Sequence, residues 1–134
     1  MESVLQFGTG RFLRAFVDRF VQQANDEGQN VGRIVVVQST GGERAGLLQR
    51  AEAGFHVVVR GYENGQVVDR VEKVESISRA LTAADQWPAV LEVARSADLR
   101  FIVSNATEAG YVLDEADAVD SAPPRTLPAK LAQV

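Results

Sequence analysis

A pair of glycines near the start of the chain has the clearest chemical meaning. Gly8, Thr9, Gly10, Arg11 and Phe12 follow the apolar run 4–7 and precede residues with helical spacing. A strand, a tight glycine turn and a helix form the entry to a nucleotide-binding βαβ unit, where a phosphate binds the free N–H groups of the helix N-terminus. The full dinucleotide pattern is G-x-G-x-x-G, and Leu13 stands at its third glycine. This turn alone is therefore a weak indication of a dinucleotide.

Polar residues also follow two later apolar runs. Gln38 and Ser39 come after residues 33–37, and Ser104 and Asn105 come after residues 100–103. Ligands of α/β sheets bind beyond the carboxyl ends of the strands, so we expect these segments and the glycine turn to form one crevice. Ordinary polar turns without a ligand are the alternative interpretation. The candidate cofactor-binding residues are Gly8, Thr9, Gly10, Arg11, Phe12, Gln38, Ser39, Ser104 and Asn105.

The residue after the second strand bears on the choice of cofactor. An NAD site usually has an acidic residue here for the ribose, whereas this chain has Gln38, which can bind a ribose without repelling a 2′-phosphate. Arg44 follows closely and would favour such a phosphate, so NAD and NADP both stay open. Glu108, His56 and Lys130 carry no pattern that indicates a proton relay, and we expect no catalytic residue within this chain.

The elements that must position these residues follow from periodicity and turn residues. Leu13, Phe16 and Phe20 share one helical face and predict a core-facing helix that ends near Gly28, with Asp18 on the opposite, solvent side. Asn64-Gly65 between apolar runs predicts an antiparallel hairpin with a type I′ turn. Further expected elements are a buried strand at 33–38, a short helix at 43–53, a helix after a capping box at 82–85, a strand at 100–105 and the start of a helix at 129–134. The predicted fold class is α/β, with a Rossmann-like, doubly wound, mostly parallel sheet and an inserted hairpin.

Composition narrows the functional classes. The chain has 134 residues, a formal net charge of -4, no cysteine and one histidine. These values argue against a nucleic-acid or acidic-membrane surface, and against disulfides and Cys- or His-rich metal sites. No apolar run approaches the ~20 residues that span a bilayer, and a strand begins almost at the N-terminus, which leaves no room for a signal peptide. We therefore expect a cytoplasmic domain without a metal.

Several segments together resemble the mannitol dehydrogenase family of long-chain polyol-specific dehydrogenases. The similarity rests on the stretch from Leu5 to Phe16, on residues 60–65, on residues 101–110 and on residues 124–131. Within that family, the chain is most similar to the subgroup that interconverts tagaturonate and altronate. The family's glycine turn carries another residue in place of the third glycine, which accounts for Leu13.

This resemblance implies an NAD(P)-dependent oxidoreductase that reduces a keto-sugar acid in hexuronate breakdown. By the same match, residues 8–12 would lie along the pyrophosphate, Gln38 and Ser39 near the adenosine ribose, and Ser104 and Asn105 toward the nicotinamide. Family members are several times longer, so residues 1–134 would be an N-terminal NAD(P)-binding domain, and the catalytic residues would follow it. Apolar surface that the rest of the longer protein would cover could then promote self-association of the domain.

Three alternatives stay open at this point. The substrate could be a mannonate or mannitol type of compound, since those enzymes belong to the same family. The domain could be a non-catalytic nucleotide sensor. An S-adenosylmethionine-dependent methyltransferase also has a glycine turn after its first strand, although Gln38 stands where that class usually has an acidic residue.

Overall fold

The structure is a computed structural model that describes residues 1–39, 54–118 and 120–134. Its strands are β1 (Glu2–Phe7), β2 (Arg33–Gln38), β3 (Phe55–Glu63), β4 (Gln66–Val74), β5 (Ile77–Thr82) and β6 (Phe101–Ser104). Its helical segments are α1 (Arg11–Leu13), η1 (Arg14–Asp18), α2 (Arg19–Asp26), α4 (Ala83–Ala94), η3 (Glu108–Tyr111) and α5 (Leu127–Gln133). The short helix expected at 43–53, with Arg44, lies outside the described residues.

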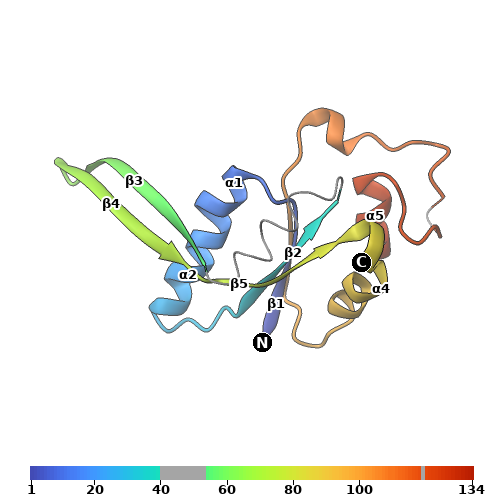
Figure 1. Ribbon diagram of the computed structural model, residues 1–134, viewed down its shortest axis with the longest axis horizontal. Coiled ribbons are helices and arrows are strands. Elements are labelled where there is room, and N and C mark those ends of the chain that lie inside the picture. Colours follow the sequence, from blue (N-terminus) through green and yellow to red (C-terminus); the bar gives the residue numbers. More distant parts are fainter. Residues whose placement is uncertain (40–53, 119) are drawn as a thin grey trace.

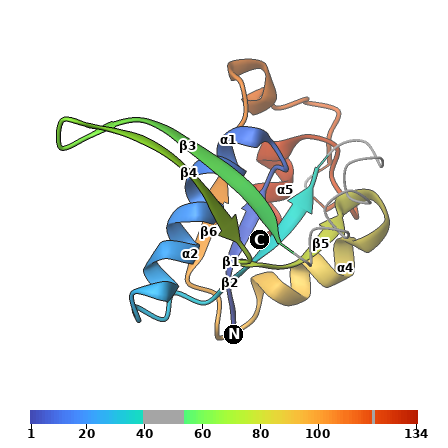
Figure 2. The same cartoon turned by 60° about the vertical axis from the view of Figure 1, so that its left-hand side comes forward.

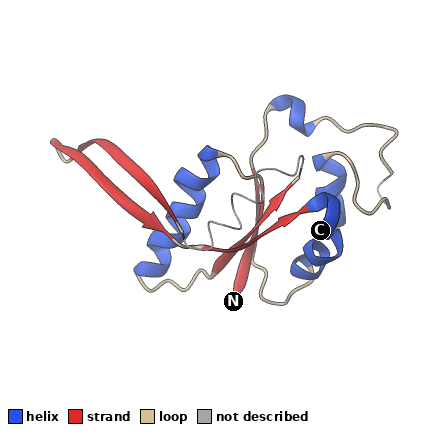
Figure 3. Cartoon of the chain, in the orientation of Figure 1, coloured by secondary structure: helices blue, strands red, loops and turns tan. Residues whose placement is uncertain are grey.

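A parallel sheet with the strand order β5-β2-β1-β6 forms the centre of the fold. Helices cover both of its faces, with α1 and α2 on one side and α4 and α5 on the other (Figures 1 and 3). Side chains alternate between the faces: Leu5 and Phe7 pack with Trp87 of α4, whereas Val4 packs with Val21 of α2. The expected mostly parallel, doubly wound sheet is confirmed.

The hairpin of β3 and β4 is inserted between β2 and β5 and forms a separate two-stranded sheet. Its tip is Asn64-Gly65, and both residues have positive φ angles, 52° and 79°, as a type I′ turn requires. Glu63 pairs with Gln66 across this turn. The hairpin projects well beyond the central sheet (Figure 2). The predicted turn and its position are therefore confirmed.

The helix after the glycine turn differs from its expected form. It runs without interruption through α1, η1 and α2, and the middle segment η1 is a π-helix. Leu13 is buried as expected, but Phe16 and Phe20 are 46% and 53% exposed, and Asp18 is fully buried. The prediction of a core-facing aromatic stripe and a solvent-facing Asp18 was therefore wrong. It assumed 3.6 residues per turn throughout, whereas a π turn is wider and rotates the residues that follow it.

The two later helices begin in different ways. α4 follows Thr82, but the expected capping box is absent, since the Thr82 hydroxyl does not cap and Gln86 Oε1 instead accepts from the Thr82 N–H at 2.9 Å. α5 begins after Thr126, whose hydroxyl oxygen accepts from the Ala129 N–H. Asp117 holds this cap in place by accepting from the Thr126 hydroxyl and from the N–H groups of Thr126 and Arg125. These hydrogen bonds lower the pKa of Asp117 to about 2. Within the described ranges, no helix is long and apolar enough to cross a membrane.

Candidate functional site

The strand order places a topological switch point at the carboxyl ends of β1 and β6. The chain runs outward from β1 to β2 and β5, and then returns across the sheet to β6 on the other side of β1. α1 and α2 lie on one face of the sheet and α4 on the other, so the connections diverge where β1 and β6 meet (Figure 1). Such a switch point is the usual ligand site of an open α/β sheet.

Gly8 brings the ends of three strands together. Its N–H donates to the Val37 carbonyl of β2 at 2.9 Å. A Cβ atom built on Gly8 would lie 3.7 Å from the carbonyl oxygen of Asn105, directly after β6, and 2.9 Å from Cδ1 of Leu13. Its φ angle of 122° also disfavours a side chain. The position therefore requires glycine for both conformation and space.

Gly10 is the N-cap of the helix and is open to solvent. Its backbone is extended, with φ -69° and ψ 161°, and no side chain caps the helix there. No atom lies within 4 Å of a Cβ built at this position. Arg11 and Phe12 of the first turn are exposed, and Thr9 is half-buried. The first N–H groups of a helix lack intrahelical acceptors, so this end offers donors to an anion with room for it to approach.

The end of β6 contributes hydroxyl and amide groups. Ser104 Oγ lies 3.5 Å from the hydroxyl of Tyr111, and Asn105 is exposed. Glu108 is also exposed, in η3. Of the candidate residues at this strand end, Asn105 is the one whose carbonyl oxygen lies near Gly8 of the glycine turn.

The end of β2 is fixed by a buried lysine. Lys130 is 3% exposed, and its ammonium group donates to the carbonyl and hydroxyl oxygens of Ser39 at 2.9 and 3.1 Å and to the Arg125 carbonyl at 3.1 Å. Burial lowers the pKa of Lys130, and Asp117 opposes this effect. Sequence reasoning missed this residue. Its spacing gives a signal, since Lys130 falls on the apolar stripe formed by Leu127, Leu131 and Val134.

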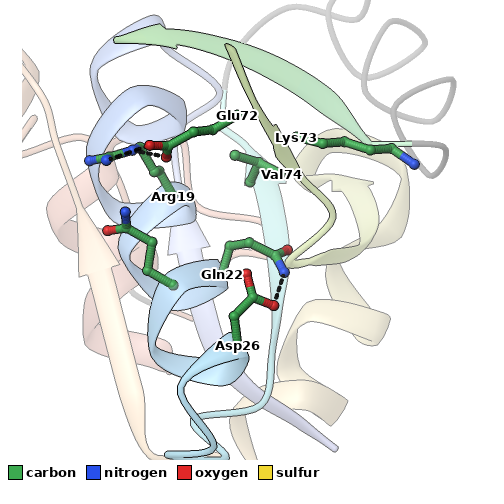
Figure 4. Close-up of a pocket in the computed structure, with 7 residues that line it drawn as sticks. Arg19, Gln22, Asp26, Glu72, Lys73 and Val74 are labelled. Carbon is green, nitrogen blue, oxygen red and sulfur yellow. Dashed lines mark hydrogen bonds and ion pairs between the residues drawn. The ribbon is translucent and has the colours of Figure 1, made fainter. Parts of the chain in front are cut away.

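A polar crevice of about 310 Å³ lies elsewhere, between α2 and the hairpin (Figure 4). Arg19 binds Glu72 there through two hydrogen bonds, of 2.5 and 3.1 Å. These bonds and those from Arg70 hold the pKa of Glu72 at about 2. Gln22 donates to Asp26. Since these side chains bind one another, the crevice anchors the hairpin to the helix and is not part of the candidate site.

The candidate residues thus divide into two groups. The glycine turn and Asn105 lie close together, since a Cβ built on Gly8 would be 3.7 Å from the Asn105 carbonyl oxygen, and Ser104 precedes Asn105 at the same strand end. Gln38 and Ser39 lie at the end of the adjacent strand β2, whose Val37 binds Gly8. In the part of the chain that the structure describes, no cluster of three or more His, Cys, Asp or Glu residues could hold a metal ion.

Comparison with known proteins adds relatives to this geometry. Altronate oxidoreductases of Phocaeicola vulgatus, Bacillus subtilis and Halalkalibacterium halodurans are 38%, 38% and 42% identical to the chain over 133, 130 and 132 residues. This chain is a relative of altronate oxidoreductases. The aligned segment is 99%, 97% and 98% of this chain but 28%, 27% and 26% of those proteins. The chain therefore spans about a quarter of the length of these altronate oxidoreductases. No family model matches it.

Solved structures confirm the fold class. A mannitol 2-dehydrogenase of Pseudomonas fluorescens, solved as a ternary complex with NAD and D-mannitol, superposes with a TM-score of 0.75 at 21% identity. A D-sorbitol dehydrogenase in substrate-free form gives a TM-score of 0.73, also at 21% identity. Each match covers 98% of this chain and 30% of the other. This chain therefore has the Rossmann-like fold of these polyol dehydrogenases.

Proposed function

We propose that residues 1–134 are the NAD(P)-binding domain of a longer cytoplasmic oxidoreductase that reduces a keto-sugar acid, of the tagaturonate-to-altronate type. The observation that carries this proposal is the uncapped, open helix N-terminus at Gly10, at the switch point between β1 and β6. Similarity to altronate oxidoreductases supports the substrate class. The NAD-bound mannitol 2-dehydrogenase of the same fold supports the cofactor.

The residues present fit a dinucleotide. The pyrophosphate would lie against the turn formed by Gly8, Thr9 and Gly10, where the first N–H groups of the helix face the open space at Gly10. Arg11 and Phe12 would border it, since both are exposed on the first helical turn. NAD(P)H would supply the hydride for reduction of the keto group.

The two neighbouring strand ends would hold the rest of the cofactor. Gln38 and Ser39 would bind the adenosine ribose, and Lys130 would fix Ser39 by binding both of its oxygens. Ser104 and Asn105 would border the nicotinamide half, next to Gly8. A neutral Gln38 accepts either NAD or NADP, so both cofactors belong in the test.

We place the catalytic residues outside residues 1–134. The related altronate oxidoreductases are several times longer than this chain, which leaves most of their length for a substrate-binding part. The candidate site offers backbone amides, hydroxyls and carboxamides, which bind and orient a cofactor but form no evident proton relay.

An exposed aromatic stripe supports self-association of the isolated chain. Phe12, Phe16 and Phe20 are 58%, 46% and 53% exposed. The ring centroid of Phe16 lies 4.8 Å from that of Phe12 and 6.1 Å from that of Phe20. Exposed apolar side chains that lie side by side can form a protein–protein contact surface. Sedimentation velocity over a range of concentrations measures this, and a monomer at every concentration would contradict it.

Ligand titration of the chain tests the proposed function. NADH and NADPH should bind with a 1:1 stoichiometry, whereas S-adenosylmethionine should not bind. Binding of S-adenosylmethionine alone would favour a methyltransferase and overturn the proposal. With the full-length protein, NADH oxidation should be fastest with tagaturonate; faster turnover with fructuronate, or with fructose, would move the assignment to a mannonate or mannitol enzyme.

A further inference from the structure

Three polar side chains behind the glycine turn have buried atoms without a hydrogen-bond partner. Among the described residues, Oε1 of Gln6, Nε of Arg14 and both carboxyl oxygens of Asp18 have no hydrogen-bond partner. Gln6 and Asp18 have no exposed surface. Buried polar groups are almost always hydrogen-bonded in folded proteins, so this cluster requires a specific explanation.

The π turn of η1 places Asp18 in this buried position. Asp18 is the last residue of that segment, and its carbonyl oxygen accepts a hydrogen bond from the Ser76 hydroxyl at 2.7 Å. Single π turns inside α-helices occur frequently at functional sites. The wider π turn therefore ends at Asp18, the residue that carries the buried carboxyl group.

Gln6 connects this region to the glycine turn. Its Nε2 group donates to the Gly8 carbonyl at 3.3 Å, which leaves Oε1 as a free acceptor. An ionised Asp18 would be a second acceptor, and two acceptors cannot bond to each other unless a proton lies between them. Burial raises the pKa of Asp18 to about 7, although a hydrogen bond from the Gln6 side chain to the ionised carboxyl group and the Arg14 charge act in the opposite direction.

We propose that Asp18 keeps its proton in the folded protein and donates it to Oε1 of Gln6, so that the Gln6 amide holds the Gly8 carbonyl. Asp18 and Gln6 are thus positioning residues for the dinucleotide turn, and this inference rests on the proposed function. One proton satisfies two of the unpaired groups at once. It also aligns the backbone at Gly8, whose conformation the site requires.

Arg14 opposes protonation of Asp18, whereas the neighbouring elements present neutral or already paired groups. Arg14 lies on the same helix, and its guanidinium group is 5.9 Å from the ring of Phe55. From the hairpin, Glu72 is already paired with Arg19, at 2.5 Å. β1 presents the neutral Gln6, and the residue before β5 is the neutral Ser76.

The test compares the wild-type chain with Asp18→Asn and Asp18→Leu. Infrared spectroscopy should show the carbonyl band of a protonated carboxylic acid at about pH 6 in the wild type and not in Asp18→Asn. The NADH dissociation constant of the wild type should rise about tenfold between about pH 6 and pH 9. Asp18→Asn should keep tight binding at both pH values, because its amide N–H donates to Gln6 without a titrating proton. Asp18→Leu should bind weakly throughout this range.

Each outcome has a defined meaning. A wild type without the acid band at about pH 6, or an Asp18→Asn variant with the same pH dependence as the wild type, would overturn the inference. If Asp18→Leu does not fold, the Asp18→Asn profile still decides. If NADH does not bind the wild type at any pH, the proposed function fails and the role in positioning a dinucleotide fails with it, while the infrared band still reports whether Asp18 is protonated.

Discussion

Substitution of Gly10 should separate ligand binding from folding. Gly10 has an extended backbone that any residue adopts, and no atom lies within 4 Å of the Cβ position. Gly10→Val therefore creates no clash within the described part of the chain. Valine is a poorer N-cap than glycine, but it also restricts the unfolded chain, so the free energy of unfolding should change by less than about 1 kcal/mol.

The same side chain should block the dinucleotide. It would occupy the space through which a pyrophosphate reaches the backbone N–H groups of the helix. Hydrogen bonds to a charged group are each worth about 1.5–3 kcal/mol, so loss of one weakens binding about 10- to 100-fold. Gly10→Ala, with a smaller side chain, should show an intermediate loss.

Gly8→Ala supplies the matched control because it should have the opposite effect. A side chain at Gly8 meets Cδ1 of Leu13 at 2.9 Å and forces a residue other than glycine to a φ of 122°. Such strain costs about 1–3 kcal/mol, which lowers the melting temperature by about 4 °C per kcal/mol in a chain of this size. NADH titration and calorimetry measure the two effects. A folded Gly10→Val protein with wild-type affinity would refute the placement of the pyrophosphate.

Four further outcomes are expected. A double-mutant cycle of Arg19→Ala and Glu72→Ala should give a coupling energy of about 0.5–1 kcal/mol, since the pair is partly exposed; a value of zero would mean that the pair does not anchor the hairpin. Asp117→Asn should lower the melting temperature at neutral pH, and the difference from wild type should shrink as the pH falls from about 4 toward 2, because the lowered pKa of Asp117 stabilises the fold only while the carboxylate is ionised. The raised pKa of Asp18 has the opposite effect: the free energy of unfolding of the wild type should fall by up to about 4 kcal/mol as the pH rises from about 4 to 7, because ionisation of Asp18 destabilises the fold. Calorimetry of Asp18→Asn should show no such dependence on pH. The isolated chain should not oxidise NADH with tagaturonate, and measurable turnover would place catalytic residues within it.

Features set by neighbouring residues could be predicted from the sequence. The strand predicted at residues 33–38 has the same bounds as β2 in the structure. Asn64-Gly65 specifies a turn that needs positive φ angles at both positions. The polar residues after β1, β2 and β6 also lie at one edge of the sheet, as the sequence predicted. These predictions depend on local conformation and on parallel strands, which share one carboxyl edge.

Features set by distant partners could not be predicted in this way. Lys130 gains its acceptors from Ser39, ninety-one positions earlier in the chain. Asp18 is buried because a π turn shifts the helical phase, and no spacing rule for an α-helix anticipates that shift. The same shift explains why Phe20 is exposed. Each error therefore comes from a partner or a backbone irregularity that periodicity does not contain.

The helix from Arg11 to Asp26 links three of these features. Its N-terminus forms the candidate phosphate site, its middle buries Asp18 behind Gly8, and its second half is bound to the hairpin through Arg19. Segment α2 has no fully buried residue, and its contacts with the rest of the fold include this ion pair, the bond from Glu75 N–H to Gln22 Oε1 and the packing of Val21 against the core. The hairpin is thus bound to the same helix whose N-terminus forms the candidate phosphate site, although no hairpin residue lies at that site.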